Sequence, residues 1–466
     1  MVSRPRRIAI VTRSLRLVPA LMLVALMGCG GGDHGSRGSS GLGDPYFPKA
    51  GNGGYDVSHY ALDLAYDPAS RHLTGTATIT ARATQDLSAF DLDLTGLTVD
   101  AITVEGEGAR WSRDGQELTV RPPRELDESE TFEVRVRYSG TPRTITDPDG
   151  SEEGWLPTSR GALALGEPTG SMAWFPGNHH PSDKASYDIA VTVPKGLRAV
   201  SNGELTGERT SKGRTTFTWR GAEPMASHVA TVAIGEYEIR RSTAGDVPVY
   251  TAVAPSEGES GESVDELSDV MEWAEYNFGP YPFSSTGVII ARAGDSEYAL
   301  ETQNRPVFPG DPDTELLVHE IAHQWFGNSV TPESWRDMWL NEGFATYAEW
   351  LWEEDQGGDS AQKTFEALYD SDDADLWAFP PAEPTGAGHI SDRPVYDRGA
   401  MVVHKIRQKV GDDAFYDLVQ GWTAARRHGN ASTDDFTEYV EKQAPDEDFG
   451  RIWEDWLYGE GKPDRP

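Results

Sequence analysis

Two histidines and a glutamate stand in one short segment, with the spacing of a metal-binding helix. His319, Glu320 and His323 lie within Thr314-Glu-Leu-Leu-Val-His-Glu-Ile-Ala-His-Gln-Trp-Phe-Gly327. On an α-helix, residues four apart leave the same face, so both imidazoles can bind one zinc ion while the glutamate stays free to act as a base. Two surface histidines that flank a glutamate would give the same pattern, so a third ligand is needed.

We expect the third ligand among the acidic residues that follow. A structural zinc site closes its coordination with four protein ligands, commonly including cysteine, whereas a catalytic site uses three and leaves one position for water. The single cysteine of the chain, Cys29, is far from the motif in sequence. Glu342 is our candidate, but spacing alone does not separate it from carboxylates that could be solvated surface groups. These are Glu315, Glu333, Asp337 and Glu349.

Local signals support a helix around the histidines. Asp311 can cap its start, Pro312 suits its first turn, and Gly327 suits its end. Two later helices are predicted by similar signals, one over 399–410 and one that begins after a cap at Thr433.

An antiparallel sheet is expected before this helical part. Between Tyr55 and about Arg240, apolar residues alternate with smaller or polar ones, which is typical of strands with one buried face. The clearest runs are Tyr60, Leu62, Leu64 and Tyr66; Phe132, Val134, Val136 and Tyr138; and Tyr187, Ile189, Val191 and Val193. A short strand around 288–290 and an acidic surface loop over 254–262 are predicted before the helices.

A second motif, Trp339-Leu-Asn-Glu-Gly-Phe-Ala345, follows the first at a short interval. The two motifs together resemble the zinc aminopeptidases typified by aminopeptidase N and the leukotriene hydrolase, which are gluzincins with a thermolysin-like catalytic fold. In that family the N-E-G-F-A glutamate completes the zinc site. The resemblance therefore implies one zinc ion bound by His319, His323 and Glu342, with Glu320 as the base.

Three further segments extend the resemblance. Tyr298-Ala-Leu-Glu-Thr-Gln-Asn304 is similar to the family's G-x-M-E-N, which implies that Glu301 holds the free amino terminus of a peptide. Gly166-Glu167-Pro168 is similar to its E-P segment, which makes Glu167 a second amine-binding candidate. Val395-Tyr-Asp-Arg-Gly-Ala400 is similar to V-Y-x-K-G-A and implies that Tyr396 stabilises the transition state.

The chain also departs from the family pattern. Tyr298 stands where the family has glycine, Thr302 replaces an asparagine, and no basic residue lies between Thr169 and Trp174. These differences affect the expected substrate subsites. They do not affect the residues that are expected to bind zinc or to act as the base. Without the resemblance, Glu167 and Glu301 would most simply be surface carboxylates and Tyr396 a packing aromatic residue.

The resemblance implies an N-terminal β-sheet domain of the saddle or sandwich type over 46–240. An α+β, mostly helical thermolysin-like zinc peptidase domain follows over 241–466. The implied activity is that of an aminopeptidase, whose substrates are peptides with a free amino terminus. Three alternatives stay open: an epoxide hydrolase, a non-catalytic peptide-binding scaffold and a thermolysin-like endopeptidase. Longer family members carry further domains, so a chain that ends at Pro466 is expected to have a more open cleft that accepts longer peptides.

The amino terminus has the pattern of an export signal. Five arginines precede an apolar run over 17–27, which is too short for an ordinary membrane-spanning helix. Leu26-Met-Gly-Cys29 resembles a bacterial lipobox, which implies a signal peptide over 1–28 and a lipid on Cys29 at the outer face of a cell membrane. A plain secretory signal with an incidental cysteine is the alternative. The glycine- and serine-rich stretch that follows predicts a flexible tether over 29–45.

The net charge is strongly negative. The 466 residues carry a formal charge of −35, which becomes about −40 without the five arginines of the signal. The negative electrostatic field of such a charge argues against nucleic acid as a partner and against membrane binding other than through the lipid on Cys29. It would also favour cationic peptides, although an acidic surface that keeps the protein soluble is the commoner explanation and the one we adopt.

Overall fold

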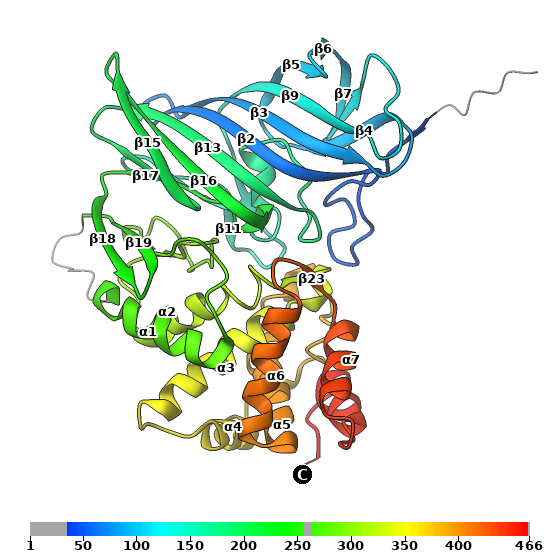
Figure 1. Ribbon diagram of the computed structural model, residues 1–466, viewed down its shortest axis with the longest axis vertical. Helices are drawn as coiled ribbons and strands as arrows, with labels where there is room; N and C mark the ends of the chain where they lie inside the picture. The colour runs from blue at the N-terminus through cyan, green and yellow to red at the C-terminus, as the bar shows by residue number, and fades with distance from the viewer. Residues whose placement is uncertain (1–34, 256–262, 465–466) are drawn as a thin grey trace, which may run out of the picture. The chain divides into compact units, whose positions relative to one another are not determined.

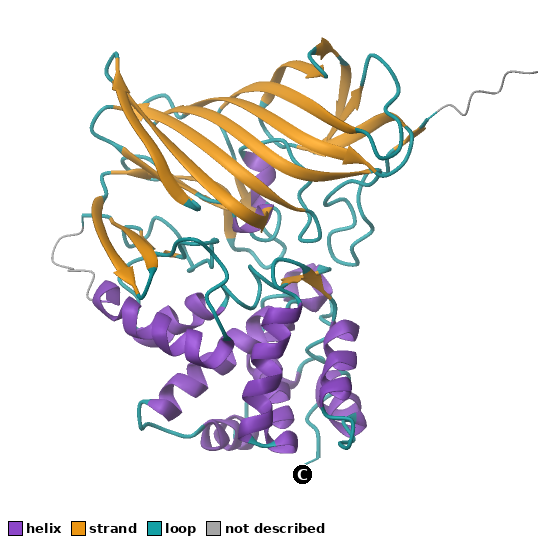
Figure 2. Ribbon diagram, in the orientation of Figure 1, coloured by secondary structure: helices purple, strands orange, loops and turns teal. Residues whose placement is uncertain are grey.

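The computed structural model describes residues 35–255 and 263–464. The described residues belong to one structural unit, in which a strand-rich half precedes a helical half (Figures 1 and 2). This confirms the expected two-part fold. The predicted signal peptide, Cys29 and most of the predicted loop over 254–262 lie outside the described residues.

The largest sheet of the first half has eight strands, and it contains all three of the alternating runs seen in the sequence. Buried apolar side chains alternate with more exposed side chains along these strands, because successive residues of a strand point to opposite faces of the sheet. Burying each such side chain contributes about 1.5–3 kcal/mol, which holds the strands in register. In spatial order the strands are β15 (Glu204–Ser211), β16 (Arg214–Ala226), β13 (Lys184–Pro194), β2 (Tyr55–Asp67), β3 (His72–Ala83), β9 (Thr131–Gly140), β5 (Thr98–Val104) and β6 (Glu107–Gly108).

Two smaller sheets complete the first half and share its core. The five-stranded one is ordered β10 (Thr144–Thr146), β11 (Glu152–Pro157), β12 (Ala162–Leu165), β17 (Val232–Gly235) and β14 (Arg198–Ser201). The four-stranded one is ordered β1 (Ser36–Arg37), β4 (Leu87–Asp93), β8 (Glu117–Arg121) and β7 (Arg110–Asp114). The segment that carries Glu167 follows β12, so the five-stranded sheet places it.

A third small sheet joins the two halves. Its order is β18 (Glu238–Ala244), β19 (Val247–Val253), β20 (Ile289–Ile290) and β21 (Val307–Phe308). Neighbouring residues point to opposite faces: Ile289 and Val307 join the core of the β half, whereas Ile290 and Phe308 join the core of the helical half. Strands β20 and β21 are therefore buried on both sides, whereas the edge strand β18 is largely exposed. Strand β18 belongs to this sheet, and its residues lie on both sides of position 240, where the sequence predicts the boundary between the two domains.

The second half is a group of helices around α3. Helix α3 packs against α2 and α5; α2 carries His319 and is followed by His323, and α3 carries Glu342. The helices are α1 (Ser263–Phe278), α2 (Thr314–Ala322), α3 (Trp339–Asp355), α4 (Ala361–Asp370), α5 (Gly399–Val410), α6 (Asp412–Ala425) and α7 (Thr433–Gln443). Two short π-helices, η6 (Pro394–Arg398) and η7 (Ile452–Leu457), and a two-stranded pair, β22 (Thr331–Pro332) with β23 (Asn430–Ala431), complete this half.

Two predicted caps are wrong by one or two residues. Helix α2 is capped by Asp313, whose carboxylate accepts from the Leu316 amide, rather than by Asp311. Helix α7 is capped by Ser432 rather than Thr433. In both cases two nearby side chains could accept the hydrogen bond from the first helical amides. The path of the backbone at the helix start determines which of the two does so. The predicted helix over 399–410 is confirmed, and Gly411 ends it with a φ of 82°.

Residues 35–45 of the predicted tether make specific contacts with the rest of the chain. The Arg37 guanidinium pairs with Asp91, and the Asp44 carboxylate accepts from Ser334 Oγ at 2.8 Å and from the Trp335 amide at 2.9 Å. This segment therefore runs along the β half and ends by capping a turn of the helical half. Its glycines and serines suggested mobility, but its charged residues find buried partners.

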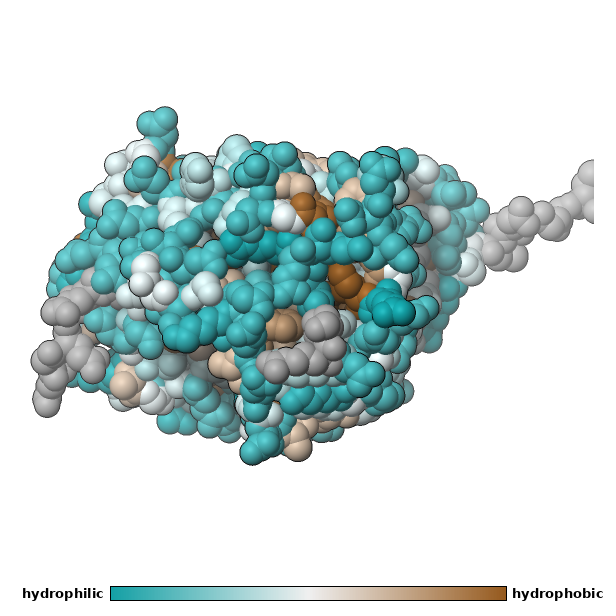
Figure 3. Space-filling model, turned by 90° about the horizontal axis from the view of Figure 1, so that it is seen from below, coloured by the Kyte–Doolittle hydropathy of each residue, from teal (hydrophilic) through white to brown (hydrophobic). Residues whose placement is uncertain are grey.

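One face of the molecule is mainly polar. The face in Figure 3 is covered mainly by hydrophilic residues, with small apolar patches between them. Over 35–255 and 263–464, helices of the length and apolar character needed to cross a bilayer are absent.

Candidate active site

A cavity of about 290 Å³ contains every site residue that the sequence predicted within the described chain. The helical half contributes residues from α2, α3 and η6, and the β half contributes the loop before β11 and the segment after β12. The residues that line it are Asp147, Pro148, Asp149, Ser151, Glu167, Pro168, Tyr298, Ala299, Leu300, Glu301, His319, Glu320, His323, Glu342, Ala387, Ile390, Ser391 and Tyr396.

The two histidines and Glu342 converge on one point. His319 lies in α2, and His323 follows its last residue in a helical conformation, so the four-residue spacing keeps both rings on one side. The Nε2 atoms of His319 and of His323 each lie 3.3 Å from the same Oε2 atom of Glu342. Glu342 lies in the first turn of α3, which packs directly against α2.

These distances fit a zinc ion. With metal–ligand bonds of about 2.0–2.1 Å, the ligand atoms of a tetrahedral site are separated by about 3.3 Å. His319, His323 and Glu342 are all buried and offer three ligand atoms, which is the donor set of a catalytic site with one position left for another ligand.

The other nitrogen of each imidazole is held by a second partner. His319 Nδ1 lies 2.5 Å from Glu349 Oε1, and His323 Nδ1 lies 3.0 Å from the Phe326 carbonyl oxygen. Such bonds fix the ring orientation and leave Nε2 for the metal. Asp337, one of the acidic residues near the motif, instead accepts from the amide and hydroxyl of Thr433.

Glu320 and Glu342 have opposite electrostatic environments within the same cavity. Burial raises the pKa of Glu320 to about 8, and the two histidines only partly offset that effect. Burial also acts on Glu342, but His323 and His319 outweigh it and lower the pKa of Glu342 to about 2. The Oε2 atom of Glu320 is buried and has no hydrogen-bond partner. Glu342 is thus suited to bind a cation and Glu320 to accept a proton.

Two more carboxylates lie next to this group. Oxygen atoms of Glu167, Glu301 and Glu342 all lie within 4.8 Å of one another. Burial raises the pKa values of Glu167 and Glu301, and neighbouring carboxylates raise them further. One oxygen of Glu167 and one of Glu301 have no hydrogen-bond partner. A cationic ligand would relieve both the repulsion and the unsatisfied oxygens.

The backbone around Glu301 is held by the turn that follows α2. Asn328 Nδ2 donates to the Glu301 carbonyl oxygen at 2.6 Å. The Asn328 carbonyl in turn accepts from Lys184 Nζ, which also contacts the carbonyls of Ser329 and Gly429. Lys184 begins β13, so the β half positions this part of the site.

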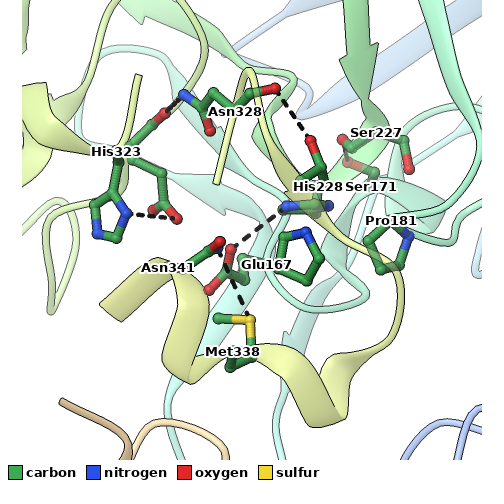
Figure 4. Close-up of polar contacts among 12 residues, drawn as sticks. Glu167, Ser171, Pro181, Ser227, His228, His323, Asn328, Met338 and Asn341 are labelled. Atoms are coloured by element: carbon green, nitrogen blue, oxygen red, sulfur yellow. Dashed lines mark hydrogen bonds and ion pairs between the residues drawn. The ribbon is translucent and has the colours of Figure 1, made fainter. Parts of the chain in front are cut away.

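On the β side, His228 is directed at Glu167 (Figure 4), and its Nε2 lies 3.7 Å from Glu167 Oε2. Burial, together with the charges of Lys184 and His180, lowers the pKa of His228 to about 3. His228 is therefore neutral, and it leaves the charge of Glu167 for a ligand.

Tyr396 lies across the His319 ring. The two rings are nearly parallel, with their centroids 6.0 Å apart. Tyr396 is in the π-helix η6, and π-helical turns often occur at functional sites. Burial raises the pKa of Tyr396 well above its ordinary value, and Glu342 and Glu167 add to this effect. Its hydroxyl therefore keeps its proton and can donate a hydrogen bond.

The sequence analysis missed the roles of Glu349, Asn328 and Lys184. Glu349 is seven residues after Glu342, which is two helical turns along the same face, so the spacing did contain a signal for it. Asn328 and Lys184 act through backbone carbonyls from distant parts of the chain, and their spacing carries no such signal.

Comparison with known proteins gives matches over both halves. The model of the peptidase M1 N-terminal domain matches residues 56–229, and that of the peptidase family M1 domain matches residues 310–456. Aminopeptidase 2 of Candida albicans is 26% identical over 365 residues, which cover 72% of this chain and 38% of that protein. Leukotriene A-4 hydrolase of Xenopus laevis is 27% identical over 322 residues, which cover 63% of this chain and 51% of that protein. The chain thus spans about half the length, or less, of these curated relatives.

A solved structure matches along nearly its whole length. A mutant of the M1 zinc metallopeptidase from Deinococcus radiodurans, bound to a Tyr-Ser-Ala substrate, is 32% identical and has a TM-score of 0.82. The match covers 91% of this chain and 99% of that one.

Proposed function

The chain belongs to peptidase family M1, and from this premise and the geometry of the cavity we propose that it is a zinc-dependent aminopeptidase. It would remove the first residue from peptides with a free amino terminus. One observation carries the proposal: Glu167 and Glu301 present unpartnered oxygens within 4.8 Å of the zinc ligand Glu342. A peptide ammonium group bound there lies about one residue from the metal site, so the scissile bond is the first one.

The substrate's amino terminus is bound by the two carboxylates. Glu301 and Glu167 pair with the ammonium group, and the Asn328 amide keeps the Glu301 backbone in place. Blocking the amine would leave two buried carboxylates without a partner, which is costly in a cavity of this kind. Selection for a free amine follows from this cost.

The chemical step uses Glu320 and Tyr396. His319, His323 and Glu342 would hold a zinc ion, which would supply Lewis acidity for polarising the scissile carbonyl and activating water. Glu320 takes a proton from the attacking water and passes it to the departing amine as the carbon–nitrogen bond breaks. The Tyr396 hydroxyl donates a hydrogen bond to the oxyanion that develops on the former carbonyl oxygen. The products are one amino acid and a peptide shorter by one residue.

A set of matched substrates tests this proposal. We expect leucine 4-nitroanilide to be hydrolysed and its N-acetyl form to be hydrolysed at least about 10²-fold more slowly, because acetylation removes the ammonium group. Chelation should abolish the activity and added zinc should restore it. Cleavage inside an amino-blocked peptide would indicate an endopeptidase. Bound zinc without turnover of any substrate would indicate a peptide-binding scaffold.

We also propose that the protein is exported and attached to a membrane through a lipid on Cys29. Support comes from the arginine-rich start, the apolar run over 17–27 and the lipobox-like Leu26-Met-Gly-Cys29. Cys29→Ser should move the protein from the membrane fraction of bacterial cells to the soluble fraction. Wild-type protein found in the medium without a lipid would favour plain secretion instead.

A further inference from the structure

Basic side chains gather around a second cavity, which lies in the β half. It has a volume of about 820 Å³ and shares no lining residue with the cavity that contains the zinc ligands. Among the described residues that line it, aspartate and glutamate are absent. This lining differs from the chain as a whole, in which 76 acidic residues outnumber 41 basic ones. We call it the basic cavity after Lys49, Arg113 and Arg143; its apolar lining includes Phe47, Ile145 and Met172.

Arg113, in β7, is held in place by backbone carbonyls. Its Nε donates to the Gly115 carbonyl at 3.1 Å, and its two terminal nitrogens donate to the carbonyls of Leu97 and Leu94. A guanidinium has more N–H groups than these bonds use, so Arg113 can still donate to a ligand. Because its orientation is already fixed, a ligand would lose little binding energy to ordering this side chain.

Arg143 lies against the same turn that Arg113 binds. A Cβ atom added at Gly96 would lie 2.8 Å from Arg143 Cδ and 3.1 Å from Arg143 Nε, so the stem of the arginine packs on this glycine. Burial and the neighbouring Arg143 both lower the pKa of Arg113, and within the described chain no carboxylate opposes them. Two like charges therefore flank the turn over 94–97. An anion bound next to both would relieve their repulsion.

The cations of the basic cavity are poorly neutralised by the protein itself. Over residues 35–255 and 263–464, the side chains of Lys49 and Arg143 form neither a hydrogen bond nor an ion pair. Glu117 lies close enough to feel the charge of Lys49, but it does not line the cavity. Burial and Asp91 raise the pKa of Glu117 to about 7, although Lys49 and Arg37 oppose the shift. Glu117 is therefore only partly charged near neutral pH.

The apolar part of the lining limits the kind of anion that fits. Phe47 is half-buried, and its ring packs edge-on against Trp335 with the centroids 5.9 Å apart. Ile145 is also half-buried, and Met172 is buried. An apolar group of a ligand would cover this surface, which a small inorganic ion would leave in water. The volume is within the range of about 300–1,000 Å³ that is usual for binding sites of small molecules.

We propose that the basic cavity is a binding site for acidic peptides, separate from the site that holds the zinc ligands. Carboxylates suit the two arginines because a guanidinium presents paired N–H groups that match both oxygens of a carboxylate. An apolar side chain of the same peptide contacts the apolar lining. This site goes beyond the proposed peptidase function and does not depend on it.

Calorimetric titration with N-acetyl-phenylalanyl-glutamate tests the proposal. This dipeptide has two carboxylates and an aromatic ring, and its acetyl group removes the amine that Glu167 and Glu301 would bind. We expect it to bind the zinc-loaded protein. Its uncharged analogue, N-acetyl-phenylalanyl-glutamine amide, should bind at least about tenfold more weakly, because its neutral amides cannot make charge-assisted hydrogen bonds on both sides.

Two variants locate the site. Arg143→Gln should weaken binding of the acidic dipeptide about tenfold, because a charge-assisted hydrogen bond is lost. The matched control is Arg110→Gln, which removes the same charge from an exposed position on β7 outside the cavity lining and should leave the affinity unchanged. Lys49→Gln gives a second route that does not depend on the folding of the Arg143 variant, with an expected loss of about threefold.

Four results would overturn the proposal. They are the absence of binding, an affinity that neither cavity variant changes, equally tight binding of inorganic phosphate, and competitive inhibition of leucine 4-nitroanilide hydrolysis. Phosphate binding would indicate a site for small anions only, and competitive inhibition would place the dipeptide among the zinc ligands. Loss of anilide hydrolysis with dipeptide binding retained would contradict the proposed function and leave the basic cavity as a peptide site.

Discussion

Buried carboxylates occur in both halves of the molecule, and they differ in what their oxygens contact. In the β half, burial and the nearby Glu117 raise the pKa of Asp93 to about 7, yet Asp93 accepts from the amides of Gly51 and His179 and from the Gln116 side chain. In the cavity, burial raises the pKa of Glu320 to about 8, but its Oε2 has no partner. A raised pKa alone therefore does not identify a functional carboxylate. Glu320 differs from Asp93 in having a carboxylate oxygen without a hydrogen-bond partner in a residue that lines a cavity.

The largest effect should come from removing the charge of Glu320. We expect Glu320→Gln to lower kcat about 10²- to 10⁴-fold, because the variant cannot accept the proton of the attacking water. Zinc content, measured on the same sample, should stay at that of the wild type because Glu320 is not a ligand.

The matched variant in the other half is Asp93→Asn. It removes a carboxylate that is equally buried but fully hydrogen-bonded, so it should lower the melting temperature and leave kcat/KM unchanged. Loss of activity in folded Asp93→Asn, or full activity in Glu320→Gln, would contradict the distinction between the two carboxylates.

A smaller effect is expected from the residue that orients His319. Glu349→Gln should weaken zinc binding about 10- to 100-fold, because the 2.5 Å contact with His319 Nδ1 loses its negative charge. Competition with a chelator of known affinity measures this change. Glu353→Gln alters an exposed carboxylate one turn later on α3 and serves as the control. Equal zinc affinities for the two variants would show that Glu349 does not act through the histidine.

The smallest effect concerns pH and the stability of the β half. Because the folded-state pKa of Asp93 is raised to about 7, its contribution to stability is complete below the ordinary aspartate pKa and is lost as the pH rises through about 7. The melting temperature of the wild type should therefore fall more between pH 5 and pH 8 than that of Asp93→Asn. A difference of 1 kcal/mol corresponds to about 2–4 °C in a protein of this size. Parallel pH profiles for the two proteins would contradict the assignment.

Sequence reasoning succeeded where a local pattern was sufficient. The alternation along Tyr60 to Tyr66 predicted β2, and the four-residue spacing of His319 and His323 predicted their convergence. It was less accurate at helix ends, where Asp311 and Asp313 offer the same chemistry two residues apart.

It failed where distant segments meet. Lys184 reaches the Asn328 carbonyl across 144 positions, and Asp147 enters the cavity on a loop of the β half. Neither contact leaves a periodic trace in the sequence. The contacts of the predicted tether could not be foreseen for a related reason, because the partners of Arg37 and Asp44 lie 54 and 291 positions away.

The sheet β18–β21 has a practical consequence for work on the catalytic half alone. One of its faces, which includes Tyr250, Ala252, Ile289 and Val307, is covered by the core of the β half. An expression fragment that began at β18 would expose this face to water and would also lack Glu167. Such a fragment should aggregate on expression, so engineering of this protein has to treat the pair of halves as its minimal unit.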